Sequence, residues 1–359
     1  MANYWSGKGQ EVTVATWAGK AVPDFYKLDK SVNRVFIGLY GNFKQEPCVN
    51  PIKGTRKLIE TSLALKPDVI ISFSDATNVV AIACGIITRT PVIAGVRTSI
   101  SHWLSERPKW RWPIFLAYRM ATQVVVQTQA CGQWLSRFTK CNPIVIPNSL
   151  RDLPDPCPER QNIVICVGRL TREKGHDLAI RAFADISPSF PDWKLFIIGT
   201  GPLLGQLNQL ATDLGIIDSV VFVGEITDTE QWMAKASLFL MPSRYEGFPN
   251  ALTEAMAMGA PVISSDCEYG PSDLVLDGKN GILVPPEDYE SLARAMRRLM
   301  ASKRLRCELG NNAMQVRELL DLSHIMSQWE ALLAKVLDGK KNRRRNDSGS
   351  SGTSFGQPR

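Results

Sequence analysis

Short apolar runs alternate with helix-length segments along nearly the whole chain. The runs are rich in β-branched residues and lie at 11–16, 35–40, 68–72, 91–96, 123–127, 143–146, 162–167, 193–198, 219–223, 238–241, 261–264 and 281–284. Helix-length segments between them include 52–65, 177–187, 203–214 and 251–258. Strands that alternate with helices form parallel sheets covered on both faces. The pattern therefore predicts an α/β fold with doubly wound sheets.

A stretch rich in Pro and Asp, residues 147–158, separates two strand-led series. We therefore expect a Rossmann-like N-terminal domain over 1–147 and a second domain over 148–321. Residues 339–359 combine a basic run with Ser and Gly and are predicted to be disordered. Contact of this basic tail with nucleic acid or lipid is the alternative.

The first residues do not open like a doubly wound domain. Residues 1–9 look like the last turns of a helix, ended by Gly7 and Gly9, before the first strand. Such a domain normally opens with a strand and a Gly-rich turn ahead of that helix. We expect that about 20–25 residues of this unit are absent, the alternative being a fold that begins with a helix.

Composition excludes several classes of protein. The 359 residues are 44% hydrophobic and 21% charged, which fits two globular domains rather than a disordered or collagen-like chain. No apolar stretch is long enough for a membrane span, and no signal peptide is evident. The eight cysteines form no Cys-x-x-Cys pair and no metal-ligand spacing with the three histidines. They are interpreted as reduced thiols of a cytoplasmic protein.

The net charge of +7 is unevenly distributed along the chain. Residues 1–147 carry +10, residues 148–337 carry −7 and residues 338–359 carry +4. This imbalance predicts that the first domain faces an anionic partner. Aromatic and basic residues alternate at 103–115, a composition that suits a membrane interface. Stacking on nucleic-acid bases and ordinary core packing are the alternatives.

The segment 243–254 follows a strand and opens a helix. Gly247 lets the backbone approach a ligand, Pro249 fits the first helical position and Asn250 fits a cap or first turn. The free N–H groups of the new helix suit a phosphate. Glu246 and Glu254 flank this helix start, where carboxylates can accept sugar hydroxyls or only complement the helix dipole.

A second candidate loop, 168–175, follows another strand. Arg169 and Lys174 would leave the strand end together and face an anionic ligand. A solvated polar turn is the alternative. The loop 199–202 and the loop from Gly224 to Ile226 also follow strands, and the latter can offer backbone groups to a base.

Two residues of the first domain, Arg97 and His102, lie just past a strand on the expected cleft side. His102 is a candidate for contact with a sugar or acceptor, and Arg97 for an anionic acceptor; a surface-loop role is the alternative for His102. His176 and His324 are predicted to lie on helix surfaces.

The ordered motifs resemble the retaining glycosyltransferases of family 4, two-domain enzymes of the GT-B fold. The resemblance rests on Gly-Arg-Leu with Lys-Gly at 168–175, Gly-Thr-Gly-Pro at 199–202, and Glu-Gly-Phe-Pro-Asn with Glu-x7-Glu spacing at 246–254. It continues through 257–262, 268–271 and 277–281. It covers residues 160–300 well and the N-terminal half loosely.

The resemblance implies two Rossmann-like domains facing across a cleft and a nucleotide-sugar donor, with UDP favoured over GDP. Glu246, Lys174 and Arg169 would be catalytic. The donor-binding set implied is Gly168, Arg169, Lys174, Gly224, Glu225, Ile226, Glu246, Gly247, Phe248, Pro249, Asn250 and Glu254. Of these, Arg169 and Lys174 would hold the diphosphate of the donor. Glu254 would accept hydrogen bonds from the ribose hydroxyls, and the base would lie near residues 224–226. The last helix, 322–338, would cross back to the first domain.

The family also implies what the enzyme transfers and to what. A hexose or N-acetylhexosamine would pass, with retention, to a saccharide or lipid-diphosphate saccharide of a surface glycan. No Asp-x-Asp motif occurs, so no metal and no cofactor are expected. The expected location is cytoplasmic and peripheral on the inner face of the plasma membrane, in contact with anionic lipid and not with nucleic acid.

This sequence departs from the family at its start. The family's first strand and Gly-rich turn form the cleft wall near the donor phosphates, and their loss would remove a central strand and expose apolar surface. The alternatives are therefore another GT-B activity, such as nucleotide-sugar epimerisation, and a catalytically dead nucleotide-sugar-binding protein.

Overall fold

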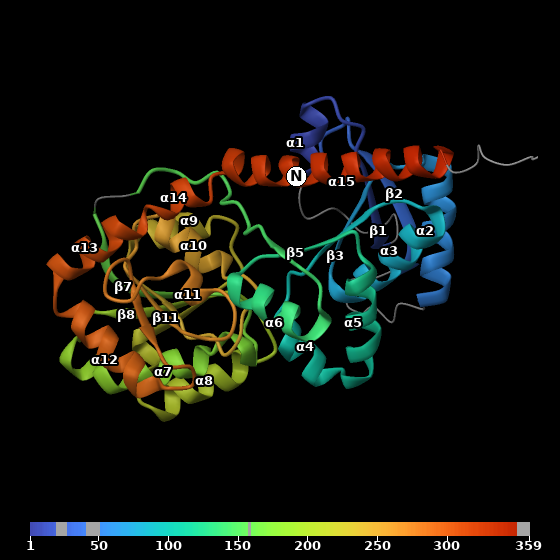
Figure 1. The fold of residues 1–359 in the computed structure, drawn as a ribbon. Coiled ribbons are helices and arrows are strands. Elements are labelled where there is room, and N and C mark those ends of the chain that lie inside the picture. Colours follow the sequence, from blue (N-terminus) through green and yellow to red (C-terminus); the bar gives the residue numbers. More distant parts are fainter. Residues whose placement is uncertain (19–26, 41–50, 157–158, 350–359) are drawn as a thin grey trace, which may run out of the picture.

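The computed structural model describes residues 1–18, 27–40, 51–156 and 159–349. Strands form at all twelve predicted runs, and no strand end lies more than two residues from its predicted bound. All strand pairs within the sheets are parallel. The predicted class is therefore confirmed, and the chain arranges its strands in two halves, shown in Figure 1.

The C-terminal half contains one continuous six-stranded sheet. Its order is β12-β11-β10-β7-β8-β9. The strands are β7 (Gln161–Val167), β8 (Lys194–Ile198), β9 (Val220–Gly224), β10 (Ala236–Met241), β11 (Val262–Ser265) and β12 (Ile282–Val284). Its helices are α7 (His176–Ile186), α8 (Leu204–Asp213), α9 (Thr229–Lys235), α10 (Asn250–Ala257), α11 (Pro271–Leu274), α12 (Tyr289–Met300), α13 (Lys303–Ala313) and α14 (Val316–Leu319).

Alternate side chains of these strands serve opposite faces of the sheet. Val164 and Leu238 belong to the core that includes α7, α8 and α12. Ile165 and Phe239 belong to the core that includes α9, α10 and α14. Because both faces are covered, every residue of the central strand β10 is buried. The chain order reverses between β7 and β10, which makes their carboxyl ends the ligand crevice expected of such a sheet.

The N-terminal half divides its strands between two sheets. In the part of the chain that the structure describes, β1 pairs only with β2, and β3-β4-β5-β6 form a separate sheet. The strands are β1 (Thr13–Ala18), β2 (Asn33–Tyr40), β3 (Ile70–Phe73), β4 (Val92–Gly95), β5 (Gln123–Val126) and β6 (Ile144–Val145). Its helices are α1 (Ala2–Gly7), α2 (Pro51–Leu65), α3 (Asp75–Thr88), α4 (Ile100–Glu106), α5 (Arg111–Met120) and α6 (Gln129–Thr139).

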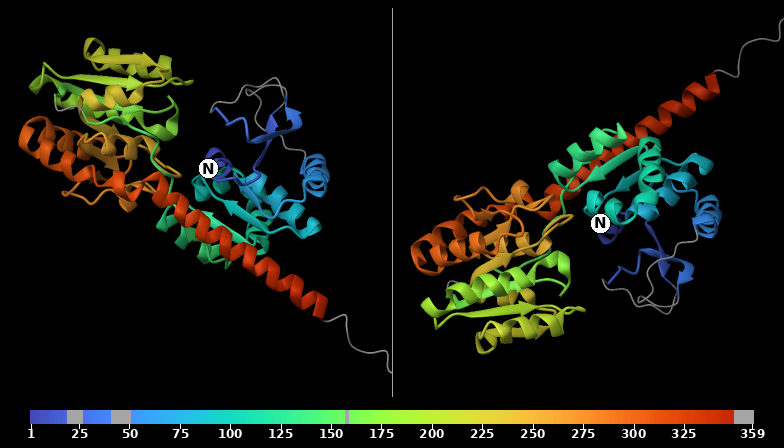
Figure 2. Two further views of the ribbon diagram at one scale, coloured as in Figure 1. Left: turned by 90° about the horizontal axis from the view of Figure 1, so that it is seen from above. Right: turned by 90° about the horizontal axis from the view of Figure 1, so that it is seen from below.

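The last helix, α15 (Leu322–Gly349), runs from the C-terminal half along the N-terminal half, as the views in Figure 2 show. Its Trp329 is buried and meets Trp5 and Phe73 edge-on, with ring centroids 6.5 and 6.4 Å apart. Lys8 adds an ion pair with Glu330. The predicted end of this helix at 338 was wrong, because the helix continues to Gly349 through part of the tail expected to be disordered; residues 350–359 lie outside the described residues.

Candidate functional site

Two loops lie at the crevice between β7 and β10. The first follows β7 and covers residues 168–175, and the second follows β10 and covers residues 242–249. The strands that carry them are direct neighbours in the sheet. The fold therefore brings together the two segments that the sequence identified separately.

Glycines allow close backbone contact around the first loop. Gly175 has a φ of +66°, and a Cβ there would lie 2.0 Å from the Pro242 carbonyl oxygen. Gly199 has a φ of +137°, and a Cβ there would lie 2.0 Å from the Gly168 oxygen. Any side chain at these positions would push the loops apart, so both glycines are required by the geometry.

Arg244 ties the two loops to each other. Its guanidinium forms two 2.8 Å bonds with the Asp177 carboxylate and donates to the Arg172 carbonyl oxygen. Its backbone N–H donates to the Glu173 carbonyl oxygen at 2.8 Å. The arginine hydrogen bonds hold the pKa of Asp177 below its usual range, against the opposing effect of burial. These hydrogen bonds hold the two loops in a fixed position relative to each other.

Lys174 of the first loop and Glu246 of the second loop form an ion pair. The Lys174 Nζ lies 2.7 and 2.9 Å from the two Glu246 carboxylate oxygens. Ser243 Oγ donates to the same carboxylate at 2.7 Å. The Glu246 side chain is only 7% exposed and Lys174 is 24% exposed. Two of the three predicted catalytic residues therefore form one hydrogen-bonded ion pair, in which the carboxylate is buried and the ammonium group is partly exposed.

Arg169 takes a different position. Its side chain is 75% exposed and pairs with Glu173 at 3.0 Å, rather than with Glu246. Its backbone is nevertheless fixed, because His176 Nε2 lies 3.1 Å from the Arg169 carbonyl oxygen. The structure thus fixes the backbone of this residue and places its guanidinium at the exposed surface of the loop, paired with Glu173.

The prediction that His176 lies on a helix surface was wrong. The residue is 3% exposed, and burial lowers the pKa of its imidazole to about 4. It begins α7 directly after Gly175, where the backbone turns inward behind the loop. The apolar spacing of this helix gave no sign of an inward histidine. His324 is exposed, as predicted.

The second loop ends at the start of α10. Pro249 occupies the N-cap and Asn250 is the first helical residue, so Pro249 lies one position earlier than predicted. Phe248 is buried. Glu254 receives an Arg151 hydrogen bond at 3.1 Å, while burial raises the pKa of its carboxyl group. The helix start and one carboxylate thus lie at the same edge of the sheet.

The residues predicted to face the base lie farther along that edge. Gly224 ends β9, and its carbonyl oxygen accepts a 2.8 Å bond from Gly199 N–H. Glu225 is exposed and Ile226 half-buried. Arg151 also bonds Thr229 at 2.8 Å and so links this region to Glu254.

The N-terminal half touches the second loop directly. A Cβ at Gly247 would lie 2.6 Å from the Arg97 carbonyl oxygen. His102 stacks on Tyr245, with ring centroids 3.6 Å apart, and its Nε2 lies 3.2 Å from Glu106. Both candidate residues of the first half therefore border the site.

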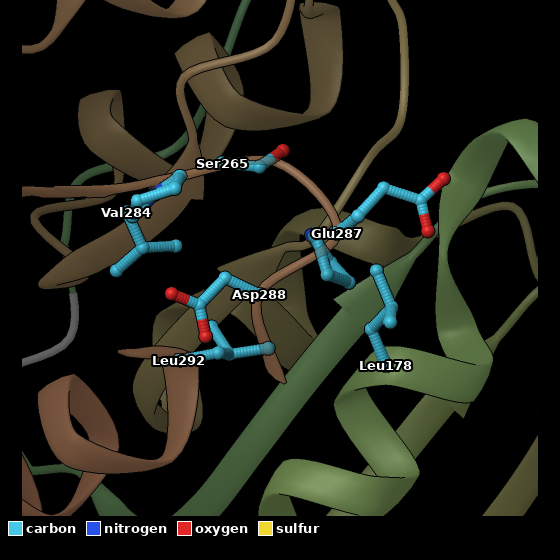
Figure 3. Close-up of a pocket in the computed structure, with 8 residues that line it drawn as sticks. Leu178, Ser265, Val284, Glu287, Asp288 and Leu292 are labelled. Atoms are coloured by element: carbon cyan, nitrogen blue, oxygen red, sulfur yellow. The ribbon is translucent and has the colours of Figure 1, made fainter. Parts of the chain in front are cut away.

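No group of side chains in the described ranges has the arrangement of a metal site. A shallow pocket lies beside the crevice, between α7 and α12, and Figure 3 shows its lining. Leu178, Val284 and Leu292 line it together with Glu287, and none of the predicted site residues does. Pro242, the first residue of the second loop, also lines this pocket, but the predicted site residues lie elsewhere on the two loops, where we place the candidate site.

Two family models match successive parts of the chain. Residues 1–150 match the model described as Glycosyltransferase Family 4, and residues 154–316 match Glycosyl transferases group 1. The chain belongs to the family 4 glycosyltransferases. The predicted resemblance is confirmed, including its extension to the N-terminal half.

Relatives of this glycosyltransferase include an enzyme of Campylobacter jejuni. That protein is named GalNAc-alpha-(1->4)-GalNAc-alpha-(1->3)-diNAcBac-PP-undecaprenol alpha-1,4-N-acetyl-D-galactosaminyltransferase; it is 29% identical over 92% of this chain and 91% of its own length. An exopolysaccharide phosphotransferase of Streptomyces coelicolor is 36% identical over 65% of this chain, but the match spans only 25% of that protein.

Solved structures confirm the two-domain GT-B architecture. Sucrose-phosphate synthase from Thermosynechococcus elongatus superposes with a TM-score of 0.79 at 22% identity, over 94% of this chain and 92% of that one. HepE of Anabaena in complex with UDP gives a TM-score of 0.73 at 22% identity, over 85% and 86%.

Sequence reasoning missed several residues that shape the site. They contact predicted residues from other elements: Ser243 bonds Glu246, Arg151 bonds Glu254, Tyr245 stacks on His102, and Asn148 donates to Asn250 at 2.9 Å. Ser243 and Tyr245 lie inside the segment 243–254, next to the predicted residues. Arg151 and Asn148 lie in the interdomain segment, where Pro and Asp indicated only a linker.

Proposed function

We propose that this glycosyltransferase transfers a hexose or N-acetylhexosamine, with retention, from a UDP-sugar to a saccharide or lipid-diphosphate saccharide of a surface glycan. The Lys174–Glu246 pair at the crevice between β7 and β10 carries the proposal. Support for UDP comes from HepE, which was solved with UDP and with UDP-glucose. Support for the acceptor comes from the name of the Campylobacter relative.

The geometry suggests how the donor is held. A diphosphate beside Lys174 would compete with Glu246 for the ammonium group and release the carboxylate toward the sugar hydroxyls. Arg169, on its fixed backbone, would close over the same phosphates, and the N–H groups of Gly247 and of the α10 start would face them. Glu254 would accept hydrogen bonds from the ribose.

In the proposed reaction the acceptor oxygen attacks the anomeric carbon on the face that the phosphate leaves. The bond from that carbon to the phosphate oxygen breaks, the new glycosidic bond forms, and the acceptor proton passes to the departing diphosphate. Lys174 and Arg169 would offset the charge that develops on the diphosphate. This scheme requires no metal ion, so EDTA should not affect the reaction.

Titration calorimetry of the purified chain with UDP and GDP, with and without EDTA, tests the donor site. We expect UDP to bind equally well in both buffers. Lys174→Met should weaken UDP about tenfold or more, because it removes a charge-assisted phosphate contact. Lys194→Met, at an exposed position where β8 begins, is the matched control.

Three results would contradict the proposal: no nucleotide binding by folded protein, binding that EDTA abolishes, or equal affinities of the two lysine variants. Transfer from a UDP-sugar to a lipid-linked acceptor, with the product anomer read by proton NMR, then tests retention. Turnover of the sugar nucleotide without any acceptor would favour epimerisation instead.

We further propose that the face of α5 contacts an anionic membrane. Trp112, Leu116 and Met120 are spaced four residues apart and are 78%, 61% and 52% exposed, so they form one apolar stripe. Residues 107–150 contain six basic and no acidic residues. Indole and aliphatic groups beside cations suit the headgroup region of anionic lipid. Within the described ranges, no helix combines the length and apolarity needed to cross a bilayer.

Vesicle co-sedimentation tests this surface. The chain should bind vesicles containing phosphatidylglycerol and bind phosphatidylcholine vesicles weakly. Replacing Trp112 and Leu116 by Ser should reduce binding, whereas Leu63→Ser, at a 58% exposed position of α2, should not. Equal binding by the two variants would contradict the proposal.

A further inference from the structure

Arg97 is a partly buried cation without an acidic partner. It follows β4, and its guanidinium lies 4.3 Å above the ring of Phe73. Its Nη1 donates to the Asn148 side-chain oxygen, and its Nη2 lies 3.9 Å from the Met1 sulfur. Burial lowers the pKa of this guanidinium to about 10. In the described part of the chain, no Asp or Glu forms an ion pair with it.

Other arginines near the crevice are neutralised. Arg244 pairs with Asp177 and Glu287, and Arg151 pairs with Glu230 and Glu254. Desolvating a charge is costly unless an opposite charge or several dipoles replace the water. Arg97 is contacted by one amide oxygen and one ring face, so in the described residues no acidic side chain offsets its charge.

The position of Arg97 places it beside the donor loop. The Asn148 amide that accepts its hydrogen bond donates to the Asn250 side chain, at the first residue of α10. The Arg97 carbonyl oxygen abuts Gly247. A guanidinium from the N-terminal half thus lies close to the helix start of the C-terminal half.

The surroundings hold this guanidinium in place. Phe73, beneath it, packs edge-on against the buried Trp329 of α15. The next residue, Thr98, donates to the Asp75 carboxylate at 2.5 Å, and Tyr118 donates to the other oxygen of that carboxylate. Asp75 is 1% exposed. Such preorganisation is typical of a binding residue rather than of a solvated surface arginine.

We propose that Arg97 binds a phosphate group of a ligand at the junction of the two halves. This inference rests on the proposed function for the source of that phosphate, which is either the donor diphosphate or the phosphate of a lipid-linked acceptor. Arg97 presents a fork of N–H donors suited to phosphate oxygens. This phosphate site would be complete only when the N-terminal and C-terminal halves are in contact.

Two titrations distinguish the sources, each with wild type, Arg97→Met, Arg97→Lys and Arg56→Met. Arg56, which is 83% exposed on α2, provides the matched loss of a guanidinium. The first titration uses UDP, and the second uses inorganic pyrophosphate in the presence of saturating UDP. Thermal melting verifies that each variant is folded.

If Arg97 binds the donor, Arg97→Met should weaken UDP about tenfold or more, and Arg97→Lys should restore part of the loss. If it binds the acceptor, UDP affinity should stay unchanged, and pyrophosphate should bind the UDP complex of the wild type but not that of Arg97→Met. The proposal is overturned if folded Arg97→Met matches Arg56→Met in both titrations.

The same titrations distinguish a failure of the Arg97 proposal from a failure of the proposed function. If wild-type protein binds no UDP, the donor assignment fails, and titration with pyrophosphate alone still tests Arg97. Equal pyrophosphate affinity of wild type and Arg97→Met would then overturn the phosphate site itself.

Discussion

The two halves use the same parallel strands and covering helices but differ in continuity. In the C-terminal half, β7 to β12 form one sheet, and all six residues of its central strand β10 are buried. In the described N-terminal half, β1-β2 and β3-β6 are separate sheets. There, Ile70 and Ile71 of β3 are only half-buried, and Phe73 is 36% exposed.

This difference shows where the site acquires its shape. The Lys174–Glu246 pair and the Arg244–Asp177 bonds lie entirely within the C-terminal half, so that half alone can assemble them. The N-terminal half contributes single residues, Arg97 and His102, by contact with the second loop. Donor binding should therefore survive disturbance of the N-terminal half better than transfer does.

The largest expected effect is on the stability of the N-terminal half. Trp329→Ala should cost about 3–5 kcal/mol, because it removes a buried indole that contacts Trp5 and Phe73. Chemical unfolding followed by circular dichroism measures the loss. Hydrogen exchange should show lost protection in α1 and β3 but not in β7 or β10.

Leu319→Ala, at a 65% exposed position of α14, is the control for Trp329→Ala and should have little effect. If protection is lost evenly over both halves, the two halves unfold as one unit. That result would contradict the expectation that Trp329 stabilises mainly the N-terminal half.

The next effect concerns pH and the C-terminal half. The His176 imidazole has a folded pKa of about 4 against an ordinary value of 6.5. Between these values the unfolded chain binds more protons, so stability falls as pH falls through that range. Protonation linked to this one histidine should lower the free energy of unfolding by about 2 kcal/mol between pH 7 and pH 5.

His176→Gln retains a donor for the Arg169 carbonyl oxygen and does not titrate. It should remove that part of the pH dependence measured by urea unfolding at the two pH values. His324→Gln, at an exposed position, should leave the slope unchanged. An unchanged slope in His176→Gln would mean that the imidazole is not held neutral.

The smallest effect tests the contact between the halves. Gly247→Ala places a Cβ 2.6 Å from the Arg97 oxygen and 3.0 Å from the Thr98 Cα, so the halves must separate slightly. We expect transfer to slow about tenfold while UDP affinity changes less than about twofold. Initial rates and calorimetry measure the two quantities.

The control for Gly247→Ala is Gly205→Ala in α8, where an added Cβ meets no atom within 4 Å. A Gly247→Ala protein with normal transfer would show that this backbone contact is not needed during the reaction.

Much of the fold was predictable because buried strands require contiguous runs of apolar, β-branched residues, which can be seen in the sequence. The β-branched run at 162–167 predicted β7 to within one residue, and the Pro-rich segment indicated the division between the halves. The end of α15 was not predictable from composition. Basic, Ser- and Gly-containing residues are typical of disorder, yet the helix continues through them to Gly349.

The site was predictable only as far as its motifs are contiguous in sequence. Gly168–Gly175 and Glu246–Glu254 each carry their own glycines and charges, and these patterns located both loops. The inward turn of His176 and the outward position of Arg169 depend on packing against neighbouring loops. Such packing leaves no periodic trace in the sequence.

By itself, the sequence determined the α/β class, the two strand series, the family and the residue types available for a phosphate and a sugar. The tertiary structure decided which of those residues meet. Strand order placed β7 beside β10 and so joined Lys174 to Glu246 across 72 positions of the chain. Contact between the halves brought Arg97 to the start of α10 through Asn148. Strands form from local apolar pattern, whereas such pairings depend on which strands become neighbours and on how the two sheets dock.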